Sequence, residues 1–311
     1  MIPTTPTRRA FLRDTALLTT AAVCFRPASA LAASAQRRSL FDGKSLTGWH
    51  SVARLAVPQA PQFASVSSGN LKAAVEKWHE SRPELQARLR HTGRWGVIDG
   101  AVVGRQEPSG SGLGAYLLSD EVFGDFDLSL EARPDWPADT GIMVRAHPLG
   151  SVGFQVLLDH RPNGVIGGVF GNGVGNFRSY PFVFDGDESE GYRVRGLRAG
   201  KAANPFFPPD FAAPLEEFLR VWRPNEWNTL RIRCAGKLPV IETWINGVAI
   251  ARLDTSKLAD RVPGYDPEVV FERIGRRGHI GFEVHDNGPM GRNRWAPGAV
   301  CRWRNISIIE L

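Results

Sequence analysis

Short apolar segments, separated by turn residues, recur along the chain and constrain its fold more than any other feature. Residues 126–131 alternate apolar and polar side chains, which buries one face of a strand and leaves the other in water. Residues 241–245 and 248–250 flank Asn246-Gly247, the dipeptide typical of a tight type I′ hairpin turn. Many short strands joined by such turns predict an all-β sandwich or jelly roll.

One early segment departs from the strand pattern. In residues 70–90, Leu71, Val75, Trp78, Leu85 and Leu89 keep a roughly helical spacing around Pro83. We interpret this segment as part of a short helical insertion, at about residues 57–92, that precedes the main sheets. A second predicted insertion, at about residues 185–224, contains the proline-rich stretch 205–209 and is expected to cover one rim of the sandwich.

Residues 1–35 have the parts of an export signal. A basic start with Arg8-Arg9 and Phe11-Leu12-Arg13 precedes a short apolar run and small residues that suit cleavage near Ala35. The paired arginines indicate the twin-arginine route, which predicts a mature protein in the periplasm or outside the cell. We expect this mature protein, 36–311, to be a single domain. An ordinary signal, or a lipoprotein processed at Cys24, is the alternative. The apolar run is too short to span a bilayer, so we expect no transmembrane segment in the mature form.

Net charge limits the possible binding partners, and the cysteine content bears on disulfide formation. Without residues 1–35 the formal charge falls from +6 to about +3, with 34 basic against 31 acidic residues. No stripe of Lys and Arg remains, which argues against nucleic acid as a partner. Cys234 and Cys301 remain, and an oxidising compartment would permit a disulfide, but the sequence does not place them within bonding distance.

A series of motifs resembles a known family. Leu40-Phe41-Asp42-Gly43-Lys44-Ser45-Leu46-Thr47-Gly48-Trp49 is similar to the opening motif of the 3-keto-disaccharide hydrolase family. Further matches follow in the order of the family, at residues 95–100, 123–128, 139–145, 153–159, 226–228, 245–247, 278–285 and 303–306. The resemblance implies a concanavalin A-like jelly-roll sandwich. The chain departs from the family pattern at Gln155, Leu157 and Glu283, where a pocket is expected.

The resemblance also implies a reaction, the cleavage of a glycoside already oxidised at C3. The ketone acidifies the C2 proton, a base removes it, and the C1 leaving group departs. The reaction needs a base, a donor or positive charge at the C3 oxygen, and an acid at the leaving oxygen. A divalent metal could fill the second role, although no cofactor is certain and the metal ligands are unknown. The expected partner is an oxidised (3-keto) sugar or another carbohydrate.

Four residues are the candidates for catalysis. His285 is the first choice for the base or acid, because imidazole titrates near working pH. Glu283 lies two residues earlier, on the same face of a regular strand, and would orient the ring. Arg145 offers a rigid guanidinium fork for the oxyanion, and Asp159 could contact sugar hydroxyls, assist proton transfer or join Glu283 and His285 around a metal. Each residue also has an ordinary structural alternative: a locally bonded histidine, an ion-paired arginine or a turn-capping aspartate.

Further residues are candidates for substrate binding. Asn172 lies in the glycine-rich stretch 167–176, which we interpret as a flexible rim or a long turn. Tryptophans, Trp95 above all, could stack on sugar faces, although a single tryptophan more often belongs to a core. The candidates for substrate contact are Gln155, His160, Trp95, Asn172, Arg178 and Tyr180, with Trp136, Trp222 and Trp295 as further stacking platforms.

Two other classes of function remain open. The main alternative is a carbohydrate-binding, lectin-like module without catalysis, and a structural module attached to the envelope is the third. An enzyme should bring His285, Glu283, Arg145 and Asp159 together, whereas a lectin should present aromatic platforms with dispersed polar groups. The sequence lacks the G-x-S-x-G nucleophile elbow, H-E-x-x-H and a dinucleotide-binding glycine motif, so those enzyme classes have no support.

Overall fold

The chain divides into residues 1–34 and a second unit, Ala35–Leu311. The computed structural model describes residues 36–311 apart from 59–60, 90, 112 and 288–293. The predicted export signal therefore lies outside the described residues.

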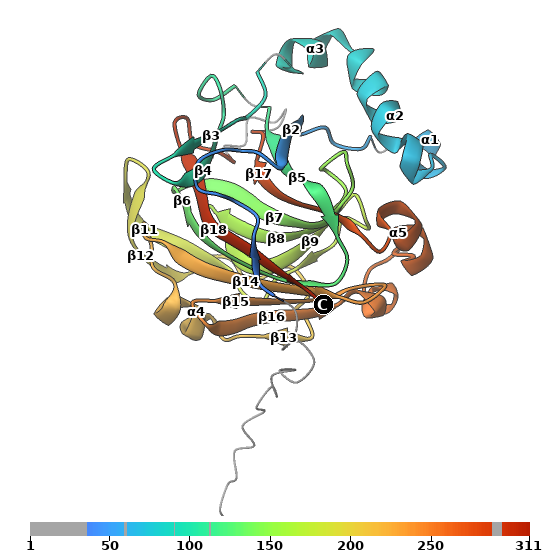
Figure 1. Cartoon of the computed structure of the whole chain (residues 1–311). Coiled ribbons are helices and arrows are strands. Elements are labelled where there is room, and N and C mark those ends of the chain that lie inside the picture. The colour runs from blue at the N-terminus through green and yellow to red at the C-terminus, as the bar shows by residue number, and fades with distance from the viewer. Residues whose placement is uncertain (1–35, 59–60, 90, 112, 288–293) are drawn as a thin grey trace, which may run out of the picture. The chain divides into compact units, whose positions relative to one another are not determined.

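Two antiparallel sheets build the second unit (Figure 1). Among the described residues, the larger sheet has nine strands in the order β13-β16-β15-β14-β6-β18-β4-β3, with β1 paired to β18. Its strands are β1 Arg38–Ser39, β3 Arg94–Ile98, β4 Ala101–Arg105, β6 Phe126–Pro134, β13 Phe211–Ala212, β14 Asn228–Ala235, β15 Val240–Ile245, β16 Val248–Asp254 and β18 Val300–Glu310.

The second sheet has seven described strands in the order β10-β9-β8-β7-β17-β5-β2. Its strands are β2 Trp49–Ala53, β5 Ala115–Phe123, β7 Ala138–Ala146, β8 Gly153–His160, β9 Val165–Asn172, β10 Arg178–Ser179 and β17 Gly278–Val284. A separate hairpin of β11 Phe184–Glu190 and β12 Arg193–Ala199 lies at the left in Figure 1. The two packed sheets confirm the predicted all-β jelly-roll sandwich.

The hydrophobic core lies between the sheets. Phe282 of β17 stacks on Trp303 of β18 with ring centroids 4.9 Å apart, and on Trp49 at 5.3 Å. Alternation places one set of side chains from each strand in this core, as in β8, where Phe154, Val156 and Leu158 are fully buried within it. The other set of β8 side chains therefore faces away from the core.

Two local predictions can be compared with the backbone. The expected hairpin is confirmed, since β15 and β16 pair around Asn246 and Gly247, whose φ angles of 47° and 85° are both in the left-handed region. The glycine-rich stretch is mostly strand: β9 includes Val165–Asn172, and only residues 173–175 form a turn there. It is thus part of the sheet, and the predicted flexible rim or long turn is wrong for residues 167–172.

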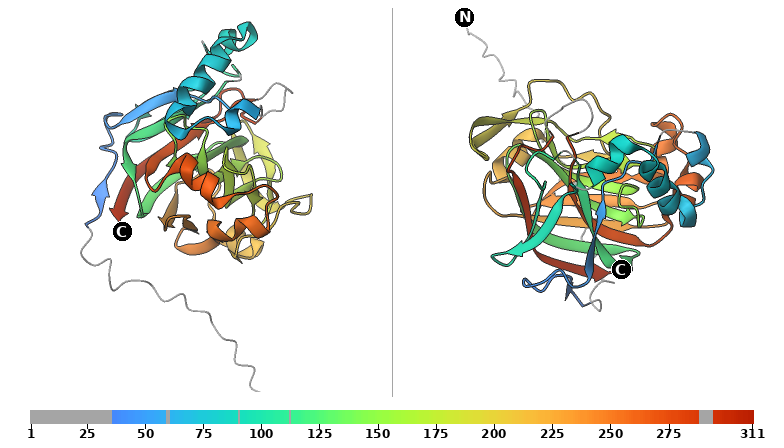
Figure 2. Two further views of the ribbon diagram at one scale, coloured as in Figure 1. Left: turned by 90° about the vertical axis from the view of Figure 1, so that its right-hand side faces the viewer. Right: turned by 90° about the horizontal axis from the view of Figure 1, so that it is seen from above.

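Helices gather between β2 and β3, as the sequence pattern predicts. They are α1 Pro61–Ala64, α2 Ser68–Glu80 and α3 Pro83–Leu89, and Figure 2 shows them beside α5, Pro267–Ile274. Ser68 Oγ donates to the Arg273 carbonyl of α5 at 2.7 Å, and His147 Nε2 lies 2.8 Å from the Ser68 carbonyl. These bonds join the start of α2 both to α5 and to the loop after β7.

The remaining helical elements are α4 Leu215–Val221 and the 3-10 helix η2 Thr255–Asp260. Residues 185–224 contain most of the β11–β12 hairpin, β13 and α4. No helix in the described ranges is long and apolar enough to cross a membrane. Cys234 and Cys301 are buried free thiols in this structure, and burial raises the pKa of Cys234 to about 11.

Candidate active site

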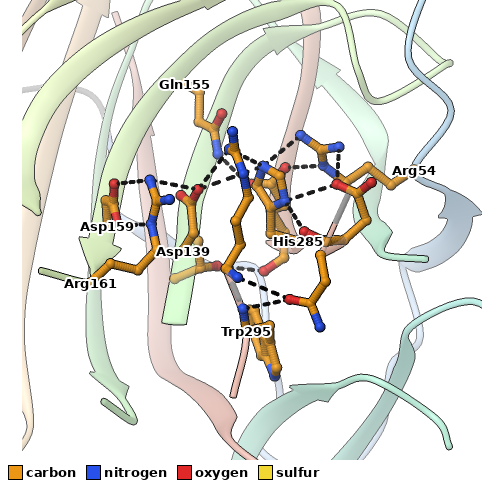
Figure 3. A network of polar contacts seen from close by, with 12 residues as sticks. Arg54, Asp139, Gln155, Asp159, Arg161, His285 and Trp295 are labelled. Atoms are coloured by element: carbon orange, nitrogen blue, oxygen red, sulfur yellow. Dashed lines mark hydrogen bonds and ion pairs between the residues drawn. The ribbon is translucent and has the colours of Figure 1, made fainter. Parts of the chain in front are cut away.

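A polar cavity of about 340 Å³ opens on the face of the seven-stranded sheet that points away from the core. Gln155, Leu157 and Asp159 of β8 line it, because they alternate with the core residues of that strand. The other lining residues are Arg54, Asp139, Arg161, Phe170, Asn172, Arg178, Tyr180, His285, Asp286 and Arg294. Several charged side chains from separate strands and loops therefore share one small cavity, and those labelled in Figure 3 point toward one another.

His285 follows the last residue of β17 and is 6% exposed at the cavity wall. Its Nδ1 lies 2.6 Å from the Asp286 backbone oxygen and 3.0 Å from the Asp286 carboxylate, so Nδ1 is the donor. Its Nε2 lies 2.8 Å from Arg54 Nη2 and 3.1 Å from Arg294 Nη1, which can only donate. These partners assign a neutral ring whose Nε2 lone pair accepts from the two guanidinium groups at the cavity wall.

Asp139, the second residue of β7, places a carboxylate beside His285 Nε2. Its Oδ2 lies 3.6 Å from His285 Nε2 and 3.1 Å from both Arg294 Nη1 and Arg161 Nη2. Burial alone would raise the pKa of Asp139, but the attraction of a protonated His285 and the charges of Arg161 and Arg294 outweigh it and hold the pKa below its usual value. Asp139 is therefore a stable carboxylate, placed to balance a proton on His285.

Asp159 is the register partner of Asp139 on the neighbouring strand β8. Arg161 Nε and Nη2 lie 2.7 Å and 2.5 Å from its two oxygens, so one guanidinium serves two buried carboxylates. Burial, and then the charge of Asp139, raise the pKa of Asp159 to about 7 against the opposing effect of Arg161. The ion-pair geometry alone would favour a lower pKa, but one positive charge cannot neutralise both carboxylates. Asp159 is thus the one of this pair that takes up a proton more readily.

Glu283 is fully buried beneath the cavity. Arg54 Nε lies 2.6 Å from its Oε1, Tyr116 donates to the same oxygen at 3.0 Å, and Gln155 Nε2 donates to Oε2. Arg54 also reaches His285, so Glu283 holds the guanidinium that contacts the imidazole. Burial raises the pKa of Tyr116 above its usual range, which keeps that hydroxyl a donor.

Metal binding can be judged from the same contacts. Asp139, Glu283 and His285 offer ligand atoms that lie within 4.8 Å of one another, with Asp139 rather than Asp159 as the third member. Arg54 and Arg294 already donate to these ligand atoms and bring positive charge to the point that a cation would occupy. The three side chains therefore fit a metal poorly in this arrangement, and we derive no step through one.

The sequence matches the 3-keto-alpha-glucoside-1,2-lyase-like domain family over residues 36–309. The chain belongs to this family. Membership confirms the resemblance seen in the motifs and identifies a carbohydrate-active domain of glycosyl-hydrolase-like kind. No curated protein matches the chain.

The solved structures that resemble this chain include carbohydrate-active proteins. A candidate glycosyl hydrolase from Parabacteroides distasonis is 18% identical, with a TM-score of 0.41, and the match covers 70% of this chain and 90% of that one. The carbohydrate-binding module CBM66 from Bacillus subtilis is 13% identical, with a TM-score of 0.38 and coverages of 70% and 92%. A beta-1,3-glucanase from Mycobacterium marinum is 13% identical, with a TM-score of 0.38 and coverages of 88% and 97%.

The prediction that Arg145 stabilises an oxyanion in this lyase-like domain is wrong. Its side chain has no exposed surface, and its Nη2 lies 2.7 Å from Asp125 Oδ1 and 3.2 Å from the Gly236 carbonyl. Arg145 adopts a left-handed backbone, with φ of 52°, near the end of β7 away from Asp139. The guanidinium therefore links turns at one end of the sandwich and does not line the cavity.

The prediction that His160 and Trp95 contact the substrate is also wrong. His160 is 1% exposed and packs edge-on against Trp136 at 4.5 Å, on the core side of β8. Trp95 packs against Trp303 at 5.7 Å. The other three proposed stacking platforms, Trp136, Trp222 and Trp295, are buried in the core. Their indole faces are occupied by the interior of the lyase-like domain, so they offer no platform to a sugar.

Of the remaining predicted residues, His285, Asp159, Gln155, Asn172, Arg178 and Tyr180 line the cavity, and Glu283 lies directly beneath it. The sequence interpretation missed the residues that supply most of the positive charge. Asp139 begins a matched family motif, and Arg161 lies two residues after Asp159, directly after the end of β8, so the sequence contained a signal for both. Arg54 and Arg294 come from loops and carried none.

Proposed function

We propose that the domain cleaves glycosides that carry a ketone at C3, by removing the C2 proton and expelling the C1 substituent. The observation that carries this proposal is the neutral His285, which lines the cavity with Arg54 and Arg294 and accepts from their guanidinium groups at Nε2. A proton acceptor beside oxyanion donors is what this elimination requires.

The reaction can be written with its atoms in balance. The C3 oxygen of the bound substrate takes over the hydrogen bonds that Arg54 and Arg294 make to His285 Nε2 in the free protein. The freed Nε2 lone pair takes the C2 proton, and the C2–H electrons form a C2=C3 double bond while the C3 oxygen becomes an enolate. Arg54 and Arg294 would stabilise that oxygen, and Asp139 would stabilise the imidazolium from 3.6 Å. The enolate then restores the C3 carbonyl, C1=C2 forms, and the C1–O bond breaks.

The leaving oxygen needs a proton. Asp159 has the raised pKa of about 7 that suits a donor near neutral pH, and Arg161 would hold it in place. Water can then add across C1=C2, placing hydroxyl on C1 and a proton on C2, which yields the free 3-keto sugar. The net result is hydrolysis achieved by elimination followed by hydration.

The arrangement favours catalysis over the lectin-like alternative. The cavity gathers charged groups. Three of the tryptophans proposed as stacking platforms are buried, and the half-buried Trp95 does not line the cavity. A binding module would have little use for a buried base flanked by two arginines and a carboxylate. Sugar binding without turnover remains the outcome that would support the alternative.

The test uses mature protein, residues 36–311, with methyl 3-keto-glucoside and the unoxidised methyl glucoside, with and without chelator. We expect release of methanol from the keto sugar alone, a fall of at least about 100-fold in His285→Ala, and no effect of chelator. Equal cleavage of both sugars would reject the ketone requirement. Unchanged turnover in His285→Ala would remove His285 from the mechanism, and binding without release would favour the lectin-like module.

We also propose that the protein acts after export by the twin-arginine route, in the periplasm or outside the cell. The paired arginines and the small-residue cleavage candidates within residues 1–35 support this location.

A further inference from the structure

A second and larger cavity, of about 670 Å³, lies next to the candidate active site. Asn172, the last residue of β9, lines both cavities. The segment after β2 passes from one to the other, since Arg54 lines the polar cavity and Ala56, two residues later, lines the larger one. The two spaces are therefore neighbours along two separate stretches of chain.

The larger cavity differs in chemistry from the polar one. Its walls come from the segment before α1, from α1 itself, from α5 and from the turn after β9. Most of the side chains there are apolar, among them Val57, Pro58, Phe63, Val174, Tyr265 and Val269. Asp266 and Arg273 are its charged members, and the amides of Asn172 and Asn176 lie on the β9 side.

Val269 marks the rim of this cavity. It is one of three large hydrophobic residues that the described part of the chain leaves exposed, at 50%, together with Ile98 and Leu311. Ile98 and Leu311 do not line the cavity. An exposed apolar side chain beside an apolar hollow is typical of a surface that a ligand covers.

The walls are held in place by bonds between elements. Arg273 Nη2 of α5 donates to the carbonyls of Phe63 and Ala64 at 3.3 Å and 3.4 Å, which ties α5 to α1. Ser151 Oγ donates to the Leu55 carbonyl, which ties the segment after β2 to the loop between β7 and β8. The cavity is thus formed before any ligand arrives.

We infer that the larger cavity binds the aglycone of the substrate, and that this aglycone is an apolar group that carries a ring. The inference rests on the proposed function, because it places the sugar in the polar cavity and the C1 substituent across the junction at Asn172. A second sugar unit would need many hydrogen-bond partners, whereas these walls offer mainly apolar surface.

The kinetic test compares benzyl 3-keto-glucoside with methyl 3-keto-glucoside, since their leaving alcohols have similar acidity. We expect kcat/KM at least about tenfold higher for the benzyl glycoside, mainly through KM. Val269→Glu should remove that preference and leave the methyl glycoside unaffected. Ile98→Glu is the matched control, because Ile98 is a β-branched residue as exposed as Val269 and does not line the cavity, and this variant should keep the preference. Ala64→Glu, at another exposed lining position, provides a second variant.

A binding test separates this inference from the proposed function. Calorimetric titration of the mature protein with 2-naphthol needs no turnover. Binding that is lost in Val269→Glu and Ala64→Glu but kept in Ile98→Glu would support the apolar site even if no keto sugar is cleaved, and only the proposed function would then fall. Cleavage with equal kcat/KM for benzyl and methyl glycosides, or a preference for a 3-keto-disaccharide, would overturn the inference alone. A protein that neither binds 2-naphthol nor cleaves a keto sugar would overturn both the inference and the proposed function.

Discussion

Asp139 Oδ2 lies 3.6 Å from His285 Nε2, and both groups line the same cavity, Asp139 from β7 and His285 from just after the neighbouring strand β17. Arg294 Nη1 lies 3.1 Å from each of these atoms and so bridges the two groups. A proton that arrives on the imidazole would therefore meet a carboxylate that is already ionised. Asp139 was not among the predicted catalytic residues, yet its carboxylate lies beside Nε2, the proposed basic nitrogen, whereas Asp286 lies at Nδ1.

Asp139→Asn should lower kcat by about 100-fold on a 3-keto-glycoside, because the imidazolium loses its nearby negative charge. KM should change less, since the amide keeps the shape of the side chain. Steady-state kinetics on the purified mature protein measure both constants. Asp187→Asn, which breaks the exposed pair with Arg198, is the control and should behave as wild type. Equal kcat in Asp139→Asn and wild type would remove Asp139 from the mechanism.

Arg145→Ala should reduce stability and leave the chemistry intact. Loss of the buried guanidinium removes one ion-pair partner of Asp125, which keeps Arg276, and takes the donor from the Gly236 carbonyl, at a cost of about 3 kcal/mol. Urea unfolding measures this change, and kcat per folded molecule should stay near wild type. Arg195→Ala, in an exposed pair with Glu188, should change stability by less than about 1 kcal/mol. A stable Arg145→Ala protein with lost turnover would restore Arg145 to the active site.

Local signals predicted much of this architecture. The alternation of residues 126–131 appears as β6, and Asn246-Gly247 forms the turn between β15 and β16. The two-residue period of a strand also brought Glu283 and His285 to one side of β17. The same rule, applied to β8, would have sent His160 to the core once Asp159 was assigned to the cavity, and the sequence interpretation did not apply it.

Other parts of the site depended on distant contacts. Arg54 and Arg294 lie 240 positions apart in the chain, and no spacing rule relates two loop residues to one histidine. Arg145 follows a strand-like run, but its left-handed backbone turns the side chain toward Asp125. Such a backbone is uncommon for a residue other than glycine, so the regular strand period gave the wrong face.

Acid should destabilise the fold through His160. Burial lowers the pKa of His160 to about 4, from 6.5 for the exposed group, so the unfolded chain binds a proton first as the pH falls. The neutral ring contributes its full stability above pH 6.5. Between pH 6.5 and about 4 this contribution is lost, which lowers the free energy of unfolding by about 3 kcal/mol. His147 and His279, whose pKa values are also lowered chiefly by burial, change stability in the same direction.

Urea unfolding at several pH values tests this expectation. His160→Gln keeps a donor for the Asp135 carbonyl and cannot be protonated, so its stability should depend less steeply on pH in this window. A profile as steep as that of wild type would show that His160 is not the group responsible.

Export should depend on the arginine pair. Replacing Arg8 and Arg9 together by Lys should keep the protein in the cytoplasm, because the twin-arginine route requires the guanidinium pair. Cell fractionation and immunoblotting locate the protein, and Arg13→Lys, which leaves the pair intact, is the control. Normal export of the double variant would contradict the twin-arginine assignment.

The most direct test of the mechanism follows the hydrogen at C2 of the sugar. Cleavage of a 3-keto-glycoside in D₂O, stopped early and analysed by mass spectrometry and NMR, should release a 3-keto sugar with one deuterium at C2. The free 3-keto sugar, incubated without protein for the same time, corrects for spontaneous exchange. Elimination through His285 predicts deuterium at C2 in the wild-type product; a product that keeps its original C2 hydrogen would contradict it.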